Sequence, residues 1–175
     1  SCPNSNRSLP PGILAAAAII TTPALADQSA AIIGQEGEEI GTATLTASPH
    51  GVMIRVEIGE DGLPGGWHGI HLHQVGDCSD VGEFKLSGGH INFDDREHGL
   101  YNENGPDNGD LPNIHAADDG SAIAEMFTHL VMLEGERGLL DEDGSALLIH
   151  ANEDDQMSQP IGGAGDRIAC AALTN

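Results

Sequence analysis

Positively charged residues are scarce in this chain of 175 residues. It contains 6 Lys and Arg against 28 Asp and Glu, which gives a formal net charge of −22. Such a surface repels polyanions, so the composition argues against nucleic acid as a partner and against binding to an anionic membrane. A small molecule is the expected partner, and an anionic one would need a local positive patch to approach.

Aromatic residues are also rare, at 3%. No long segment shows the hydrophobic periodicity of an amphipathic helix. Instead, short alternating or β-branched runs are separated by Gly, Asp-Gly and Pro. We expect strands near Ala30–Ile33, Gly41–Ala47, Val52–Ile58, Gly69–His73, Ala122–Phe127, Ala146–His150 and Ile168–Leu173. About eight short strands of this kind predict an all-β fold, an antiparallel β-sandwich or flattened barrel.

No apolar run is long enough to span a bilayer as a helix, which takes about 20 residues. The clearest run, from Gly12 to Ile20, follows Arg7 and precedes Ala24-Leu25-Ala26. This is the pattern of a signal peptide with its cleavage site, and the nearby prolines argue against a short buried helix. We therefore predict a signal peptide over 1–26 and one exported domain over 27–175.

The chain has only three cysteines, Cys2, Cys78 and Cys170. Removal of the signal peptide would leave Cys78 and Cys170 as the one possible intramolecular pair. Export to an oxidising compartment favours a disulfide. It would close a loop of roughly 90 residues and stabilise the fold by up to about 4–5 kcal/mol. The alternative is that both are buried free thiols.

What the chain does have is histidine in a telling arrangement, His68-Gly69-Ile70-His71-Leu72-His73. Because side chains alternate along a strand, His71 and His73 would share one face, where two imidazoles can bind one metal ion. Further histidines and acidic residues follow at His90, His98, Asp107, Asp110, His150 and Asp154. Together these residues predict a metal site.

Two long segments lack strand patterns. Residues 75–119 are rich in Gly, Asp and Asn and contain several of these histidines, and residues 151–166 follow His150. Loops of this length in a compact domain are usually functional or disordered. Metal binding can organise such a loop, because the free energy of binding becomes free energy of folding. We predict two functional loops.

In order and spacing, these residues resemble the copper/zinc superoxide dismutases of the bacterial exported type. The matching segments are residues 66–73, 76–78, 88–92, 97–99, 109–113, 149–151 and 163–170, so the likeness covers the chain from about Gly41 to Leu173. The resemblance implies a Greek-key β-sandwich in the periplasm that converts superoxide to oxygen and hydrogen peroxide, with copper and zinc as cofactors.

The resemblance also implies roles for individual residues. Copper would be bound by His71, His73, His90 and His150, and zinc by His90, His98, Asp107 and Asp110. His90 would bridge the two metals and take part in proton transfer. Asp154 would link ligand histidines of the two metals, and Arg167 would attract the anionic substrate near copper.

Three positions depart from the family pattern. Asp107 stands where the family has its third zinc histidine; we expect zinc still to bind, and the alternative is a copper-only or zinc-poor enzyme. Ile161 replaces a threonine on the rim of the copper channel, and Phe93 replaces a proline. We interpret His68 as structural, and His50, His115 and His129 as surface or satisfied core residues.

We therefore predict a superoxide dismutase, an oxidoreductase that acts as a monomer or homodimer. The alternative is a periplasmic protein on the same fold that binds or buffers copper without catalysis. Loss of dismutation with retention of copper after replacement of Arg167 would favour the enzyme.

Overall fold

Nine β-strands and one short 3₁₀-helix form the fold in residues 27–175, the part of the chain that the computed structural model describes. The predicted signal peptide lies outside the described residues. The strands are β1 (Asp27–Gly34), β2 (Glu39–Ser48), β3 (Gly51–Ile58), β4 (Gly66–His68), β5 (Ile70–His73), β6 (Ile114–Ala116), β7 (Ala122–Thr128), β8 (Ser145–His150) and β9 (Arg167–Leu173), with helix η1 (Lys85–Ser87) between β5 and β6. Among these residues, no helix is long and apolar enough to cross a membrane.

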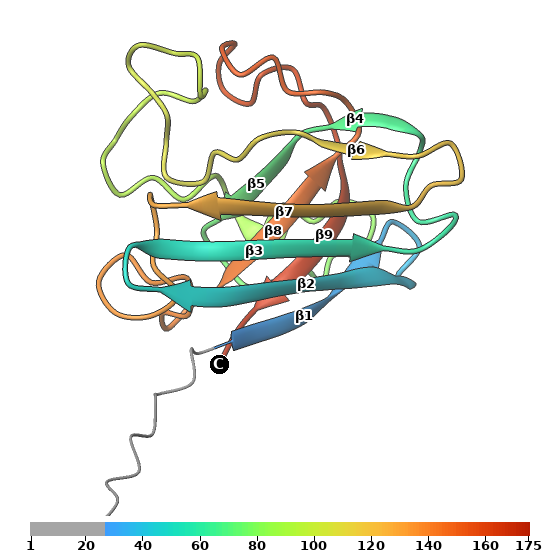
Figure 1. Cartoon of the computed structure of the whole chain (residues 1–175), viewed down its shortest axis with the longest axis horizontal. Coiled ribbons are helices and arrows are strands. Elements are labelled where there is room, and N and C mark those ends of the chain that lie inside the picture. The colour runs from blue at the N-terminus through green and yellow to red at the C-terminus, as the bar shows by residue number, and fades with distance from the viewer. Residues whose placement is uncertain (1–26) are drawn as a thin grey trace, which may run out of the picture.

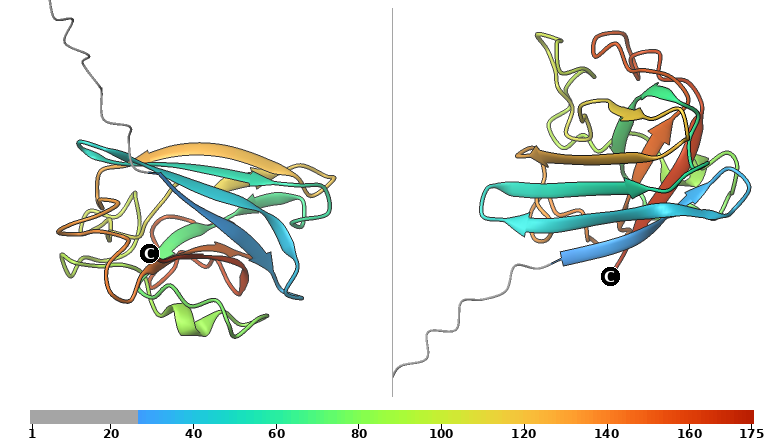
Figure 2. Two further views of the ribbon diagram at one scale, coloured as in Figure 1. Left: turned by 90° about the horizontal axis from the view of Figure 1, so that it is seen from below. Right: turned by 45° about the vertical axis from the view of Figure 1, so that its right-hand side comes forward.

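Seven strands form one antiparallel sheet in the order β5-β8-β9-β1-β2-β3-β7, and β4 pairs with β6 in a second, small sheet. The large sheet curls, so that β2, β3 and β7 form one layer and β5, β8 and β9 cross behind it (Figures 1 and 2). The chain crosses from one layer to the other between β3 and β5 and again between β7 and β8, as in Greek-key folds. The predicted all-β sandwich is confirmed.

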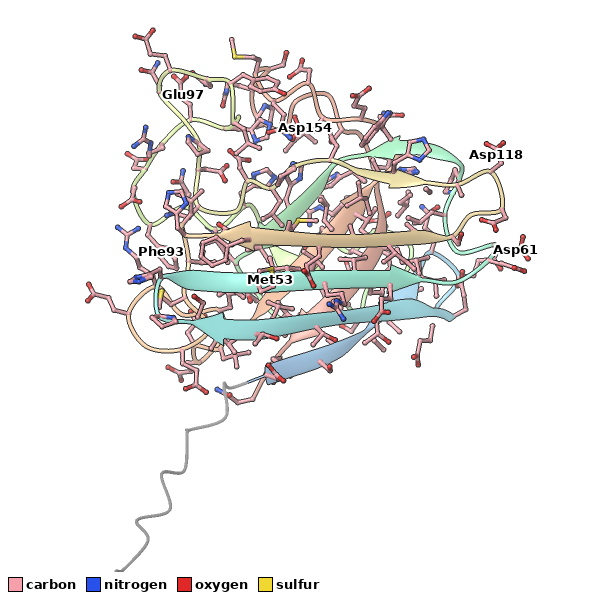
Figure 3. The ribbon with its side chains drawn as sticks, in the orientation of Figure 1. Met53, Asp61, Phe93, Glu97, Asp118 and Asp154 are labelled. Atoms are coloured by element: carbon pink, nitrogen blue, oxygen red, sulfur yellow. A yellow bond between two sulfur atoms is a disulfide. The ribbon has the colours of Figure 1, made fainter. Side chains whose placement is uncertain are left out.

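The core lies between the two layers and follows from strand alternation. In β3, Val52, Ile54 and Val56 are fully buried, whereas Met53 and Arg55 between them are exposed. Figure 3 shows Met53 on the outer face of the strand. Facing side chains from β8 and β9 complete the same apolar cluster. Because only one face of β3 is apolar, a register slip of this strand would expose its core residues, and this fixes its pairing.

Strands β5 and β8 are buried on both faces, for two different reasons. Ile70 and Leu72 on β5 point into the main core. On the opposite face, Ala146 and Leu148 of β8 pack against Phe84, which belongs to the loop after β5. His71 pairs with Leu148 and His73 with Ala146, so the histidines lie on this second, loop-covered face.

The predicted strands match the observed ones within a few residues, with two differences. The segment Gly69–His73 is split, because Gly69 separates β4 from β5 and donates its N–H to the carbonyl of Asn152. Strand β6 was not predicted, since it is only three residues long and lies inside a segment without strand pattern. It pairs with β4, and its His115 lies beside Trp67.

The yellow-green part of the first predicted loop lies beside the second loop, 151–166, at the upper end of the barrel in Figure 1, whereas the part with Phe84 packs against β8. The part of the first loop that contains His98 and Asp110 contacts the second loop through several hydrogen bonds. A disulfide joins Cys78 to Cys170, with a Cα–Cα distance of 5.9 Å, so the predicted pairing is confirmed. It attaches the start of the first loop to β9.

Candidate metal centre

Four buried histidine rings converge beneath the loops. One ring nitrogen from each of His71, His73, His90 and His150 belongs to a group of donor atoms that all lie within 4.8 Å of one another. These are the residues that the sequence predicted as copper ligands. Two come from β5, one from the end of β8 and one from the first loop. The structure thus brings together residues separated by up to 79 positions, from His71 to His150.

His90 reaches this group because the first loop runs along the free edge of β5. The N–H of Leu72 donates to the carbonyl of Gly109 (2.9 Å), and the carbonyl of Leu72 accepts from the N–H of Ile91 (2.9 Å). A side chain at Gly109 would not fit, because a Cβ there would lie 2.3 Å from the oxygen of Leu72. This backbone pairing places His90 opposite His73 and Asp110 opposite His71.

The second nitrogen of each ring is held by an acceptor. Nδ1–H of His73 donates to the carbonyl of Gly88 (2.9 Å), and Nδ1–H of His150 donates to that of Gly165 (3.0 Å). Nε2–H of His71 donates to Asp154 (2.7 Å), and Nδ1–H of His90 donates to Asp107 (2.8 Å). These contacts fix each ring's orientation and leave the other nitrogen with its lone pair.

Those remaining nitrogens are His71 Nδ1, His73 Nε2, His90 Nε2 and His150 Nε2. All four are buried and have no hydrogen-bond partner among residues 27–175. Buried polar atoms are normally satisfied, so four such atoms at one point require an explanation. A bound metal ion provides one, because it accepts the lone pairs of neutral imidazoles.

Burial also keeps three of these rings neutral. Desolvation lowers the pKa of His71, lowers that of His73 well below its usual value, and lowers that of His150 to about 3. A protonated ring cannot bind a metal through the protonated nitrogen. At neutral pH these three histidines are therefore ready to act as ligands without losing a proton.

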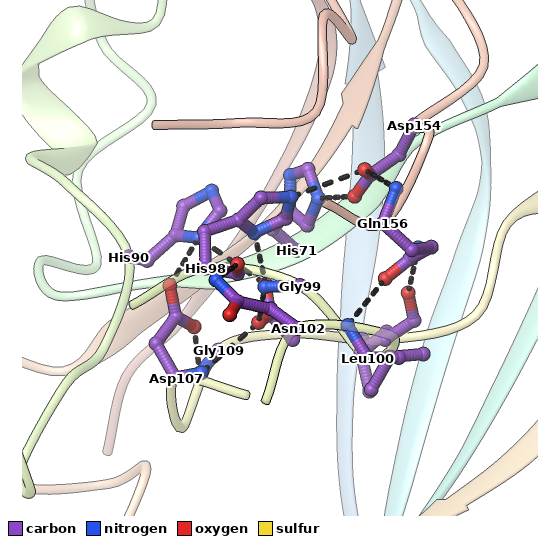
Figure 4. Close-up of polar contacts among 12 residues, drawn as sticks. His71, His90, His98, Gly99, Leu100, Asn102, Asp107, Gly109, Asp154 and Gln156 are labelled. Carbon is purple, nitrogen blue, oxygen red and sulfur yellow. Dashed lines mark hydrogen bonds and ion pairs between the residues drawn. The ribbon is translucent and has the colours of Figure 1, made fainter. Parts of the chain in front are cut away.

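A second group of donors lies next to the first and shares His90 with it. It comprises His90, His98, Asp107 and Asp110, with donor atoms again within 4.8 Å of one another. Nδ1 of His90 lies 2.8 Å from Asp107 (Figure 4). Asp110 lies 2.5 Å from Nδ1 of His98 and 3.6 Å from Nδ1 of His90. These are the residues that the sequence predicted as zinc ligands.

The second group has the opposite electrostatics. Burial opposes the charged form of His98, but hydrogen bonds to Asp110 and Asp154 outweigh it and raise its pKa to about 10. The carboxylates of Asp107 and Asp110 likewise outweigh burial at His90 and raise its pKa. The same contacts overcome desolvation at Asp110 and hold the pKa of its carboxyl well below its usual range. Without a metal, His98 is therefore held as the charged partner of Asp110 and Asp154.

Asp154 connects the two groups. Its Oδ2 accepts from Nε2 of His71 (2.7 Å) and its Oδ1 from Nε2 of His98 (3.1 Å), with the side chain fully buried (Figure 4). Although burial favours the neutral acid, hydrogen bonds from these histidines hold the pKa of Asp154 well below its usual range. One carboxylate therefore orients a ring in each group.

Other residues that hold this arrangement were not singled out by the sequence. Asn113 pairs with Asp154, since its Nδ2 donates to the backbone carbonyl and its Oδ1 accepts from the backbone N–H. Gln159 pairs with both backbone groups of His98 in the same manner. Asn113 lies in a matched segment, but nothing in one sequence distinguishes such a clamp from a surface amide.

Arg167 lies at the start of β9, beside the first histidine group. Its guanidinium donates to the carbonyls of Phe84 (2.7 Å) and Gly88 (2.7 Å) and to the hydroxyl of Ser87 (3.0 Å). Gly88 is also the acceptor for His73, so one carbonyl joins the arginine to a histidine of the group. Arg167 further lines a surface pocket with Lys85, where Glu83 and Asp166 supply the opposite charge.

The other histidines lie outside both groups, as predicted. His68 is buried, with its ring nitrogens 2.7 Å from the carbonyls of Pro64 and His150. His50, His115 and His129 are exposed on the surface. Ile161 is partly buried in the second loop, next to Gly162.

The residues present fit copper and zinc. Four imidazole nitrogens suit Cu(II), and imidazole is also common for Zn²⁺. Two imidazoles with two carboxylates form an acceptable four-ligand set for Zn²⁺. The carboxylates of Asp107 and Asp110 each present one oxygen to this set, because the others accept backbone N–H groups, from Gly109 in one case and Gly99 in the other.

Comparison with known proteins places the chain in a family. The family model for copper/zinc superoxide dismutase matches residues 39–173. The superoxide dismutase [Cu-Zn] of Caulobacter vibrioides is 46% identical over 149 residues, covering 83% of this chain and 84% of that protein. Superoxide dismutase [Cu-Zn] 1 of Aquifex aeolicus is 40% identical over 144 residues, covering 81% and 84%. The crystal structure of a superoxide dismutase-like protein from Bacillus subtilis superposes with a TM-score of 0.78 at 32% identity, covering 86% of this chain and 99% of that one. The chain belongs to the copper/zinc superoxide dismutase family.

Proposed function

We propose that this protein is a superoxide dismutase with one copper and one zinc site. Copper would be bound by His71, His73, His90 and His150, and zinc by His90, His98, Asp107 and Asp110. Bound copper would supply the one-electron redox chemistry by which two superoxide ions and two protons become oxygen and hydrogen peroxide. The observation that carries the proposal is the convergence of four buried, unpartnered imidazole nitrogens.

The protein's own residues have distinct tasks in this reaction. The carbonyls of Gly88 and Gly165 and the carboxylate of Asp154 keep three rings in one tautomer. His90 faces both donor groups, and we assign it to move a proton at Nε2 toward the reduced product. Arg167 stays cationic despite its partial burial, which lowers its pKa, because guanidinium is a very weak acid.

Arg167 matters most because the rest of the molecule repels the substrate. The chain has a formal net charge of −22, so an anion meets an unfavourable field over most of the surface. A fixed guanidinium beside His73 gives the site local positive potential. Its three hydrogen bonds to the first loop hold it in place.

We also propose that residues 1–26 are a signal peptide and that residues 27–175 act in the periplasm. Two observations support export. The first is the order of a basic residue, an apolar run and Ala24-Leu25-Ala26. The second is the disulfide Cys78–Cys170, which persists in oxidising compartments. N-terminal sequencing of the exported protein tests this, and a mature chain that does not begin near Asp27 would contradict it.

Metal analysis and a dismutation assay on the same sample test the catalytic proposal. We expect one copper and one zinc per chain, with high activity. Replacing Arg167 by Gln should lower the rate while copper stays bound. If copper binds without activity in the wild type, the alternative of a copper-buffering protein holds instead. If no copper binds after reconstitution, the assignment of the four histidines is wrong.

A further inference from the structure

Two glycines stand together in the second loop, and their surroundings differ sharply. Gly162 and Gly163 both have left-handed backbones, with φ of 62° and 71°. A Cβ on Gly163 would meet nothing within 4 Å. A Cβ on Gly162 would lie 1.7 Å from Oδ1 and 2.6 Å from Cγ of Asp154, and 3.0 Å from Nε2 of His98.

The carboxylate of Asp154 has no room to move away from such a Cβ. Its Oδ1 accepts from the N–H of Gln156 (2.7 Å) and from His98, and its Oδ2 accepts from His71 (2.7 Å). Its backbone is clamped by Asn113 on both sides. The side chain is fully buried, so any displacement breaks hydrogen bonds that water cannot replace.

Gly162 is itself hydrogen-bonded to the turn that directly follows Asp154. Its N–H donates to the carbonyl of Ser158 (2.6 Å), and its carbonyl accepts from the N–H of Asp155 (2.9 Å). The backbone of residue 162 therefore cannot retreat without opening the turn that follows Asp154. A side chain at this position must push the carboxylate away from its two histidines.

We propose that Gly162 is a positioning residue that allows Asp154 to orient a histidine in each metal site. The absence of a side chain at residue 162 lets one carboxylate contact Nε2 of His71 and Nε2 of His98 together. The inference rests on the proposed function, because it takes His71 as a copper ligand and His98 as a zinc ligand. It extends that function to Gly162, which is itself not one of the proposed metal ligands.

The test compares Gly162→Ala with Gly163→Ala in protein loaded with Cu²⁺ and Zn²⁺. Both variants place alanine in a left-handed backbone, so they share that strain, and only the first meets Asp154. We expect zinc affinity, measured by competition with a chromophoric chelator, to fall about 10–100-fold in Gly162→Ala, as for loss of partners that orient metal ligands. The d–d absorption band of bound Cu²⁺ should shift as well, because His71 loses its fixed orientation. Gly163→Ala should match the wild type in both measurements.

A double-mutant cycle separates this role from a general effect on folding. In an Asp154→Ala background the carboxylate is gone, so adding Gly162→Ala should change zinc affinity little. If Gly162→Ala alone does not fold, folding of the double variant supports the proposal, and failure of both overturns it. Equal zinc affinity in Gly162→Ala and Gly163→Ala, or an undiminished effect without Asp154, also overturns it. A wild type that binds neither metal would refute the proposed function instead.

Discussion

The two donor groups differ in how the fold holds them. The proposed copper group is built mainly on strands, with His71 and His73 on β5 and His150 at the end of β8. The proposed zinc group has His98, Asp107 and Asp110 on the loop between β5 and β6. In the first, burial keeps the rings of His73 and His150 neutral, while in the second, carboxylates keep the ring of His98 charged. The first is preorganised by the sheet, and the second needs ion pairs or a metal to order its loop.

The loops show the same contrast. The segment before His90 is attached to β9 by the disulfide Cys78–Cys170 and by the hydrogen bonds of Arg167. The segment after His90 is held by side-chain contacts to the second loop, from Gln156 and Gln159. A covalent bond thus secures the copper side, and polar contacts secure the zinc side.

The largest expected effect comes from removing a strand-borne ligand. His150→Ala should lower copper affinity by more than the about 100-fold that loss of an orienting partner costs. Zinc affinity should change little, because His150 belongs to the first group only. Metal titration of both sites measures this, with the exposed His129→Ala as the matched control. Full copper occupancy in His150→Ala would show that the four-histidine set is wrong.

Removing the disulfide comes next. Replacing Cys78 and Cys170 by Ser opens a loop with a sequence separation of 92, and we expect unfolding to need about 4–5 kcal/mol less free energy. Urea unfolding of metal-free protein measures the difference. Wild-type protein under reducing conditions should behave like the double variant. A change below about 1 kcal/mol would mean that the first loop is held by its other contacts.

The sequence could predict the strand-borne part of the metal centre better than the loop-borne part. Alternation predicted β5 and β8 and placed His71 with His73, because a strand leaves its side chains only two directions. The position of His90 required the pairing of the first loop with the edge of β5, which no local pattern indicates. The roles of Asn113, Gln159 and Gly162 depend on contacts across 41 to 61 residues or on the space around one atom. Such features are visible only once the loops are folded.

The ion pairs of the zinc group predict a pH dependence for metal-free protein. The pKa of His98 is raised from 6.5 to about 10, so the stabilisation by its proton is complete below about pH 6.5 and lost as the pH rises toward 10. The groups that face His98 are the carboxylates of Asp110 and Asp154 and the rings of His71 and His90. The carboxyls of Asp110 and Asp154 have lowered pKa values, so their contribution is present at neutral pH and lost in acid.

We expect metal-free protein to lose on the order of 2 kcal/mol of unfolding free energy over this alkaline range. One pKa unit corresponds to about 1.4 kcal/mol, and coupled neighbours share the effect. Urea unfolding at several pH values measures the loss. His98→Gln should show much less of it, and zinc-loaded wild type should show less too, because metal replaces the proton. An unchanged slope in His98→Gln would assign the loss to another group.

The smallest expected effect is on zinc affinity and comes from replacing Asp107, which directly tests the contrast between the two donor groups. Its Oδ2 lies 2.8 Å from His90, and its Oδ1 accepts the N–H of Gly109 (2.9 Å). Asp107→His exchanges an oxygen donor for nitrogen, which Zn²⁺ accepts readily and Mn²⁺ does not prefer. We expect zinc affinity to rise about tenfold, or about 1.4 kcal/mol, with no gain for Mn²⁺.

Asp107→Asn should bind zinc more weakly than the wild type, because it keeps the shape and loses the charge. Chelator competition with both ions measures these differences. Weaker zinc binding in Asp107→His would mean that the loop depends on the carboxylate, because its second oxygen accepts the N–H of Gly109 and so holds Gly109 against β5. The variant would then gain a better donor atom for zinc but lose the loop conformation that presents it.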